Sequence, residues 1–269
     1  METQEKLALL QQNMQSMGSL LVAFSGGVDS TFLLAVARAT LGEKVQAVTA
    51  ISPVYPERET RECQRLADLI QVDWSLLPVD QLNLPGFADN SVERCYLCKR
   101  QLFENLLNIA RDKGIACVAD GSNIDDLDDF RPGMKAVREL GIKSPLLEAG
   151  LSKNEIRSLS QKMGLDTWDK TAAACLASRF ATGEKISLEK LAMVEQAEDY
   201  LLNLGFKQVR VRMHRDLARI EVGTYERRLL AAEDMMDKIA AHFKQLGFHY
   251  VTLDMQGYQM GSMNMGQIR

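Results

Sequence analysis

Three of the five cysteines have the spacing and surroundings of metal or redox ligands. Cys95 and Cys98 form the CxxC of RCYLCK, and Cys175 lies in the polar segment AAACLASR. A lone CxxC fits a redox dithiol, half of a zinc site or part of an iron–sulfur cluster. A zinc site needs about four ligands, and the sequence holds no second CxxC. Three thiolates favour a 4Fe–4S cluster whose open iron holds an extra sulfide for delivery; three unconnected thiols are the alternative.

The other cysteines and the histidines do not complete such a site. Cys63 falls inside an expected helix and Cys117 inside an expected buried strand, so both are predicted to be core thiols. The three histidines lie far from the cysteines along the chain, at His214, His242 and His249. An odd, unevenly spread set of cysteines is no disulfide framework, which indicates a reducing cytoplasm.

The segment SGGVDS is suited to binding phosphate. Gly26 and Gly27 allow a sharp turn that exposes backbone N–H groups, and the helix expected after it directs its positive end to the same place. Ser25 and Ser30 add hydroxyl donors, whereas Asp29 repels bare phosphate but suits bound Mg²⁺. No Gly-Lys-Ser/Thr follows, so this is not a Walker loop. The sequence predicts a phosphate or pyrophosphate site at the carboxyl edge of a sheet.

SGGVDS resembles the signature of the PP-loop ATP pyrophosphatases, which cleave ATP to AMP and pyrophosphate and adenylate a carbonyl or carboxylate. GSNIDD, after the fourth expected strand, is similar to that family's second nucleotide loop. In it Gly121 permits close backbone approach, and Ser122 and Asn123 offer polar contacts. The acidic run that continues to Asp129 is either a solvated loop or a metal- or substrate-facing one.

A more specific resemblance covers most of the chain. RCYLCK, GSNIDDLDDFRPGMKAVRELGIKSPL and TWDKTAAACLASR together resemble the LarE family of ATP-dependent sulfur transferases. This implies that a carboxylate of pyridinium-3,5-biscarboxylic acid mononucleotide is adenylated and becomes a thiocarboxylate, on the way to the nickel-pincer nucleotide of lactate racemase. One kind of member sacrifices the sulfur corresponding to Cys175; the other carries a 4Fe–4S cluster on three cysteines, and this sequence matches the second. The implied cofactors are ATP, Mg²⁺ and the cluster, with metal ligands Cys95, Cys98, Cys175 and Asp29.

Four arginines are candidates for binding phosphate groups. Arg210 and Arg212 lie on the polar face of the expected strand VRVRMH, and their guanidinium forks match phosphate; a solvated basic face is the alternative. The resemblance, in which the RVR segment binds the substrate phosphate, favours binding. It also implies that Arg131 and Arg179 contact nucleotide phosphate. Glu221, on the neighbouring strand, either orders these arginines or binds metal.

Two successive patterns must position these residues. Within residues 1–183, apolar runs alternate with helical stretches, which predicts parallel βαβ units. We expect an α/β fold with a doubly wound, mostly parallel sheet of the PP-loop, adenine nucleotide alpha hydrolase-like type, and a helix that begins at residue 98. Residues 184–269 predict a helix–strand–strand–helix–strand unit, a smaller α+β domain for substrate binding or oligomerisation.

Composition limits the class of protein and its partners. The chain has 269 residues, 32 basic and 36 acidic side chains and a net charge of −4, which argues against a nucleic-acid partner. No apolar run approaches the roughly 20 residues of a membrane span, and the polar N-terminus is no signal peptide. We therefore expect a cytoplasmic enzyme with a small-molecule nucleotide substrate. The resemblance implies a homo-oligomer, for which a hexamer is one candidate, and the sulfur donor is left open.

Three rival functions stay open from the sequence. A PP-loop enzyme of tRNA thiolation would need an RNA-binding surface and show salt-dependent RNA affinity. A nucleotide- or metal-binding regulatory module would bind ATP without releasing pyrophosphate. A synthetase that uses ammonia as nucleophile would have no need of Cys175.

Overall fold

The computed structural model describes residues 2–127, 132–171, 174–259 and 263. The chain forms two compact units. The first comprises Met1–Asp80 and Glu93–Ala173, and the second comprises Gln81–Val92 and Ala174–Arg269. The main part of the second unit begins at Ala174, whereas the predicted boundary is near residue 184. The segment Gln81–Val92 also belongs to this unit.

Hydrogen bonds explain why the earlier segment belongs to the second unit. The buried Asn90 side chain donates to Ala181 O at 2.7 Å, and Gly183 N–H donates to Asn90 O at 2.9 Å. Ile186 N–H donates to Ala88 O at 2.9 Å. A sequence pattern does not reveal such pairings, because they join segments about 90 residues apart in the chain.

The first unit is an α/β domain around a four-stranded, fully parallel sheet of order β3-β2-β1-β4. The predicted doubly wound, parallel architecture is confirmed. Its strands are β1 (Leu20–Ala23), β2 (Val45–Ile51), β3 (Asp73–Pro78) and β4 (Cys117–Ala119). Its longer helices are α1 (Thr3–Met17), α2 (Val28–Leu41), α3 (Glu57–Ile70), α4 (Arg94–Asp112), α5 (Pro132–Glu139) and α7 (Lys153–Lys162). Its short elements are η1 (Gly42–Lys44), η2 (Ile124–Leu127), α6 (Pro145–Glu148) and η3 (Asp166–Asp169).

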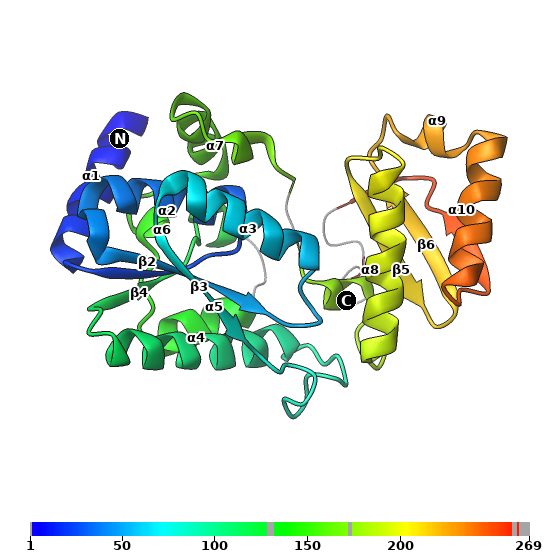
Figure 1. The fold of residues 1–269 in the computed structure, drawn as a ribbon, viewed down its shortest axis with the longest axis horizontal. Coiled ribbons are helices and arrows are strands. Elements are labelled where there is room, and N and C mark those ends of the chain that lie inside the picture. The colour runs from blue at the N-terminus through cyan, green and yellow to red at the C-terminus, as the bar shows by residue number, and fades with distance from the viewer. Residues whose placement is uncertain (1, 128–131, 172–173, 260–262, 264–269) are drawn as a thin grey trace. The chain divides into compact units, whose positions relative to one another are not determined.

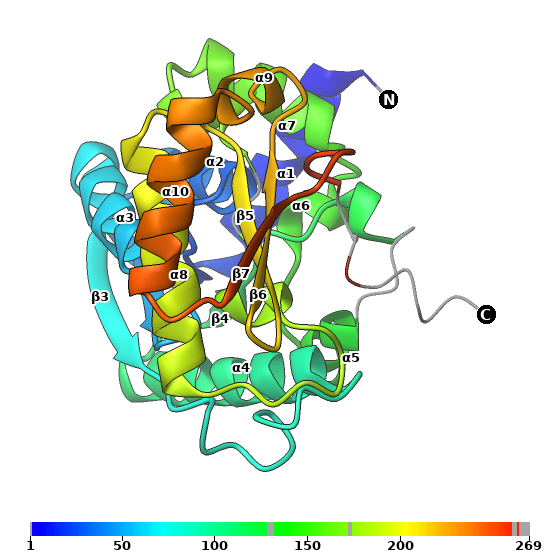
Figure 2. The ribbon, with the colours of Figure 1, turned by 90° about the vertical axis from the view of Figure 1, so that its right-hand side faces the viewer.

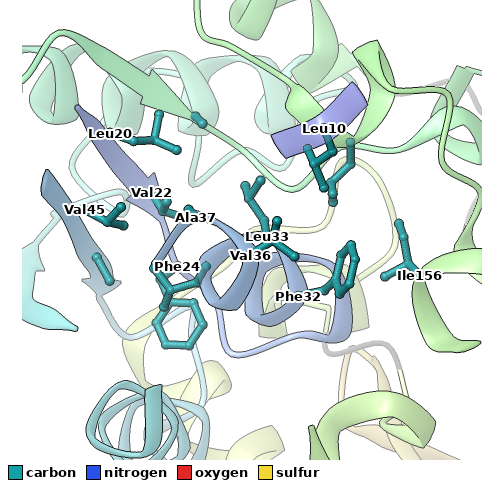
Figure 3. Packing of buried hydrophobic residues seen from close by; sticks show 14 of the residues in the cluster. Leu10, Leu20, Val22, Phe24, Phe32, Leu33, Val36, Ala37, Val45 and Ile156 are labelled. Carbon is teal, nitrogen blue, oxygen red and sulfur yellow. The ribbon is translucent and has the colours of Figure 1, made fainter. Parts of the chain in front are cut away.

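Both faces of this sheet are covered, because its strands are apolar on both sides. Leu20 and Val22 of β1 pack with α1, α2 and α7 in one core, to which Phe32 and Ile156 contribute (Figure 3). The alternate residue, Leu21, packs on the other side against a second core with Phe103 and Val137 from α4 and α5. Figure 1 shows α4 and α5 below the sheet and α1, α2 and α3 above it.

The strand order places the predicted binding loops at one point. β1 leads through α2 to β2 on one side, whereas β4 lies on the other side of β1. In such sheets ligands bind outside the carboxyl ends of the strands where the order reverses. The loop after β1 and the loop after β4 are therefore neighbours at this switch point, which is where SGGVDS and GSNIDD lie.

The second unit carries a three-stranded sheet of order β5-β6-β7, with β5 antiparallel and β7 parallel to β6. Its strands are β5 (Val209–His214), β6 (Leu217–Val222) and β7 (Tyr250–Leu253), and its helical elements are η4 (Leu176–Arg179), α8 (Leu188–Asn203), α9 (Arg227–Leu230) and α10 (Glu233–Gln245). The predicted order of a helix, two strands, a helix and a strand is confirmed. Tyr200 of α8 stacks on His242 of α10 with ring centroids 3.8 Å apart, and Figure 2 shows both helices beside the strands.

Helix boundaries follow the predicted caps, with one correction. Ser152 and Glu155 form the predicted capping box at the start of α7, and Ser187 caps α8. Helix α4, however, begins at Arg94 and not at residue 98, because no helix-breaking residue precedes Cys98 in RCYLC. Among the described residues, no helix is both long and apolar enough to span a bilayer.

Candidate active site

The segment SGGVDS, predicted to bind phosphate, joins β1 to α2. Gly27 is the residue before the first helical residue, so the N–H groups of the first turn of α2 face the loop. Ser25 N–H donates to Ser30 Oγ at 3.3 Å, and the two hydroxyl oxygens are 3.1 Å apart. Ser30 Oγ also donates to Gly27 O at 3.2 Å. These bonds close the loop at the start of α2.

Two glycines of the predicted loops allow close approaches that other residues would block. Gly26 has φ +66°, and a Cβ there would lie 2.9 Å from Cys63 Sγ. A Cβ on Gly121 would lie 3.0 Å from the backbone nitrogen of Ser30, so the loop after β4 touches the first turn of α2. Cys63 is buried in the core, as predicted, and burial raises the pKa of its thiol to about 11.

Asp29 has one carboxylate oxygen available for a cation. Its Oδ2 accepts a hydrogen bond from Lys153 Nζ, and its Oδ1 is buried with no hydrogen-bond partner among the described residues. Burial raises the pKa of the Asp29 carboxyl above its ordinary value, and the charge of Lys153 opposes that rise. A buried, unsatisfied carboxylate oxygen beside a phosphate-binding loop fits the oxygen-rich ligand set of Mg²⁺.

Two lysines beside the loop were missed by the sequence analysis. Lys153 is the first residue of α7 and is 124 positions from Asp29 in the chain. Lys170 Nζ donates to Gly26 O at 3.0 Å and to Glu59 Oε2 at 2.8 Å. Both add positive charge beside a site predicted for phosphate. The capping box at Ser152 indicates where α7 begins, but no pattern indicates which loop its first residue reaches.

The polar residues of GSNIDD mostly serve the loop itself. Ser122 is buried, and its Oγ donates to Asp120 Oδ2 at 2.5 Å. Asp120 also accepts from Ser144 Oγ at 2.7 Å. Asn123, also buried, accepts at its Oδ1 from Asp125 N–H at 3.0 Å. The proton of the Ser122 hydroxyl is therefore engaged by Asp120, whereas the bond to Asn123 uses only its Oδ1. Of the other predicted residues, Arg131 and the acidic Asp128 and Asp129 lie outside the described residues.

The CxxC motif lies inside the first two turns of α4. Residues three apart on a helix share a face, so Cys95 and Cys98 are spaced to ligate one metal centre together. Cys95 is exposed, and Cys98 is half-buried with Tyr55 Oη 3.7 Å from its Sγ. Arg94 Nη2 lies 3.8 Å from Cys95 Sγ. This geometry supplies two thiolates and fits part of a cluster site.

Cys175 belongs to the second unit, whereas Cys95 and Cys98 belong to the first. It is half-buried and immediately precedes η4. Among the described residues, no three His, Cys, Asp or Glu side chains form a group that could hold a metal ion. The predicted set of three ligands thus contains one preformed pair and a third thiol carried by a different unit.

Arg179, Arg210 and Arg212 are buried in the second unit, so the alternative of a solvated basic face on β5 is wrong. Arg212 is 5% exposed and pairs with Glu221 Oε2 through Nε at 3.0 Å and Nη2 at 2.9 Å. Glu221 is fully buried and also lies 3.3 Å from Arg219, so it orders arginines, one of its two predicted roles. Arg179 is 1% exposed and pairs with Glu198.

Arg210 is buried in a different setting from Arg212. Its Nη1 donates to Val209 O at 2.6 Å, and its guanidinium carbon lies 5.2 Å from the centroid of the Tyr258 ring. Burial lowers the pKa of the Arg210 guanidinium, and the charge of Arg179 acts in the same direction. Because both effects disfavour its positive charge, an anion bound beside Arg210 would be stabilised.

Comparison with known proteins finds relatives along nearly the whole chain. The pyridinium-3,5-bisthiocarboxylic acid mononucleotide synthase of Lactiplantibacillus plantarum is 37% identical over 260 residues, covering 96% of this chain and 94% of that protein. An uncharacterized protein of Synechocystis is 42% identical over 261 residues, 97% of both chains. One from Methanocaldococcus jannaschii is 29% identical over 258 residues, 95% of this chain and 98% of that protein. No protein-family model matches the chain.

Proposed function

The chain belongs to the LarE family, and from that premise we propose that it is an ATP-dependent sulfur transferase that makes a thiocarboxylate. The substrate is a carboxylate of pyridinium-3,5-biscarboxylic acid mononucleotide, consistent with the product named for the Lactiplantibacillus relative. The observation that carries the proposal is the loop of the first unit, where a closed phosphate cradle adjoins the unpartnered Oδ1 of Asp29.

ATP activates the carboxylate, which by itself is a poor electrophile. A carboxylate oxygen attacks the α-phosphorus, the bond to the β-phosphate oxygen breaks, and pyrophosphate leaves with that electron pair. The leaving pyrophosphate suits the N–H groups at the start of α2 and the hydroxyls of Ser25 and Ser30. Lys153 and Lys170 add positive charge beside them. Asp29 Oδ1 would hold Mg²⁺, which supplies charge neutralisation for the phosphates.

A sulfur nucleophile then replaces AMP on the acyl carbon. A thiolate or sulfide attacks at neutral pH without a general base, and the acyl–oxygen bond to AMP breaks. Cys95, Cys98 and Cys175 would hold a 4Fe–4S cluster, which supplies a labile sulfide when bound. The CxxC pair on one face of α4 supports this assignment.

A second route for the sulfur is donation from Cys175 itself. The Cys175 thiolate attacks the acyl-adenylate and expels AMP, and β-elimination then leaves the sulfur on the product and dehydroalanine in the chain. This route needs only the half-buried thiol of Cys175, which lies immediately before η4.

The phosphate of the substrate is assigned to Arg210. Its buried guanidinium has a lowered pKa, so a phosphate dianion beside it restores a favourable environment for the charge. Arg212 donates from both Nε and Nη2 to Glu221 Oε2.

Product analysis tests the proposal. Protein purified without oxygen is given ATP, Mg²⁺ and substrate, and pyrophosphate and thiocarboxylate are measured beside iron and acid-labile sulfide. We expect pyrophosphate and thiocarboxylate together, and Cys175→Ala should abolish the thiocarboxylate. Absence of pyrophosphate would overturn the proposed function.

The iron analysis separates the two sulfur routes. About four irons per chain, lost in Cys95→Ala, support the cluster. Iron-free protein whose Cys175 loses sulfur in one turnover, detected by mass spectrometry, supports the sacrificial route.

A further inference from the structure

One guanidinium in the second unit holds the main chain at Cys175. Arg179 Nη1 donates to Ala174 O at 2.7 Å, to Cys175 O at 3.0 Å and to Ser178 Oγ at 3.0 Å. Ser178 Oγ in turn donates to Cys175 O at 2.8 Å. The carbonyl of Cys175 therefore receives two side-chain hydrogen bonds, and the backbone just before the thiol is fixed by a side chain four positions later.

The other two nitrogens of Arg179 anchor this clamp to the rest of the unit. Nε and Nη2 donate to Glu198 Oε1 and Oε2 at 2.8 and 3.0 Å. Glu198 lies on α8 and is fully buried. Its Oε1 also accepts from Val211 N–H on β5 at 3.1 Å. Glu198 thus joins α8, β5 and the cysteine segment at one carboxylate.

A second buried pair holds the same segment from β5. Arg212, paired with Glu221, donates from Nη1 to Ser178 O at 3.1 Å. A β-bridge between Phe180 and Met213 continues the attachment to β5. The C-terminal end of η4 is therefore held by Arg212 of β5 and Glu198 of α8, and Arg179 links that end to the main chain before η4.

Such an arrangement is a poor way to gain stability alone. Desolvation of two ions offsets most of their attraction, and apolar residues of the same volume often stabilise a core as well. What a bidentate Arg–carboxylate pair adds is fixed geometry. A nucleophile must be held near its reacting carbon, and an error of about 1 Å costs about 100-fold in rate.

We propose that Arg179 and Glu198 are positioning residues that fix the Cys175 main chain so that its sulfur is presented for transfer. The inference rests on the proposed function, in which Cys175 carries or ligates the transferred sulfur. It replaces the expectation that Arg179 contacts nucleotide phosphate, because all three guanidinium nitrogens already donate within the second unit.

The test uses Glu198→Gln in the full chain, with Arg179→Lys as a second variant if the first does not fold. Glutamine keeps the volume and removes the charge, and lysine keeps the charge and removes the fork. The matched control is Leu191→Ala, which removes a buried side chain from the same helix without touching the clamp. Hydrogen exchange of the amides in 174–180, pyrophosphate release and thiocarboxylate formation are measured for each.

The expected result separates the two half-reactions. Exchange in 174–180 should rise about tenfold or more in Glu198→Gln, and thiocarboxylate formation should fall about 100-fold, while pyrophosphate release in the first turnover stays within about twofold of wild type. Leu191→Ala should show neither the faster amide exchange in 174–180 nor the selective loss of thiocarboxylate formation.

Three results would overturn the inference. The rates of pyrophosphate release and thiocarboxylate formation could fall equally, which would support a contact between Arg179 and the nucleotide phosphate. Exchange in 174–180 could stay as in wild type. The control Leu191→Ala, at an equal loss of thermal stability, could also lose thiocarboxylate formation while it retains pyrophosphate release. Failure of the proposed function is visible separately, because wild-type protein would then release no pyrophosphate at all.

Discussion

The nucleotide loop of the first unit and the cysteine segment of the second are held in opposite ways. At the nucleotide loop, the ion pairs of Lys153 with Asp29 and of Lys170 with Glu59 have side chains that are 20–31% exposed. At the cysteine segment, the pairs of Arg179 with Glu198 and of Arg212 with Glu221 involve side chains of at most 6% exposure.

This difference corresponds to the role proposed for each region. Partly hydrated ion pairs contribute little to stability and exchange partners at small cost, so a loop built from them can give its charges to an arriving phosphate and Mg²⁺. Fully desolvated pairs cost several kcal/mol to break. A segment held by them keeps its nucleophile in place through the reaction. The comparison predicts graded consequences when each region is altered.

The largest expected effect is on the buried pair that holds Ser178. Arg212→Met should lower the free energy of unfolding by about 3–5 kcal/mol, because the buried Glu221 loses both hydrogen bonds from Arg212. Arg38→Met is the control, since its pair with the exposed Glu43 should cost less than about 1 kcal/mol. Denaturant unfolding of the full chain measures both. Equal losses in the two variants would contradict the distinction between buried and hydrated pairs.

The second effect is on the glycine of the nucleotide loop. Gly26→Ala should weaken ATP binding by about 100-fold, because the residue has φ +66° and its new Cβ would lie 2.9 Å from Cys63 Sγ. Titration calorimetry measures the affinity. Gly42→Ala, with φ +62° and open space around the Cβ, is the control for backbone strain alone. If Cys63→Ala partly restored ATP affinity in the Gly26→Ala background, the restored part of the affinity would be attributed to the clash with Cys63 Sγ.

The third effect concerns the carboxylate proposed for Mg²⁺. Asp29→Asn should weaken Mg²⁺-dependent ATP binding by about 10–100-fold. In wild type the affinity should also fall as the pH is lowered, because protons compete with the cation at a carboxyl whose pKa is already raised by burial. The variant should lack this pH dependence. Titrations of ATP affinity between about pH 8 and 5 test this pH dependence, with Asp73→Asn, at an exposed residue, as control. If Asp29→Asn showed the same pH dependence as wild type, the Asp29 carboxylate would not be a Mg²⁺ ligand.

The smallest effect is on the contact between α1 and α7. Burial acts to raise the pKa of the Glu155 carboxyl, but hydrogen bonds from Lys6 and Ser152 lower this pKa from 4.5 to about 2. The stabilisation is therefore present above the unfolded-state pKa and is lost as the pH falls toward 2. Glu155→Gln should cost about 1–2 kcal/mol at neutral pH, and its unfolding free energy should converge with that of wild type in acid. A constant difference across the pH range would rule out this origin.

Much of the site could be anticipated from local sequence. The strand–loop–helix context of SGGVDS, the glycine turn at Gly26 and the core thiol of Cys63 all follow from periodicity and residue type. Lys153 and Glu198 could not be anticipated. Each is an ordinary charged residue on a helix, and only docking of that helix shows which loop it reaches.

The sequence by itself determined the order of βαβ units, the parallel sheet with both faces apolar, the caps at Ser152 and Ser187 and the phosphate loop. These features depend on dihedral preferences and on periods of two and 3.6 residues, which act over a few positions. Only the tertiary structure decided that Arg179 and Arg212 face buried glutamates and not solvent. The local sequence around an arginine is the same whether it faces a buried glutamate or solvent, because the partner comes from an element that packs against it only after folding.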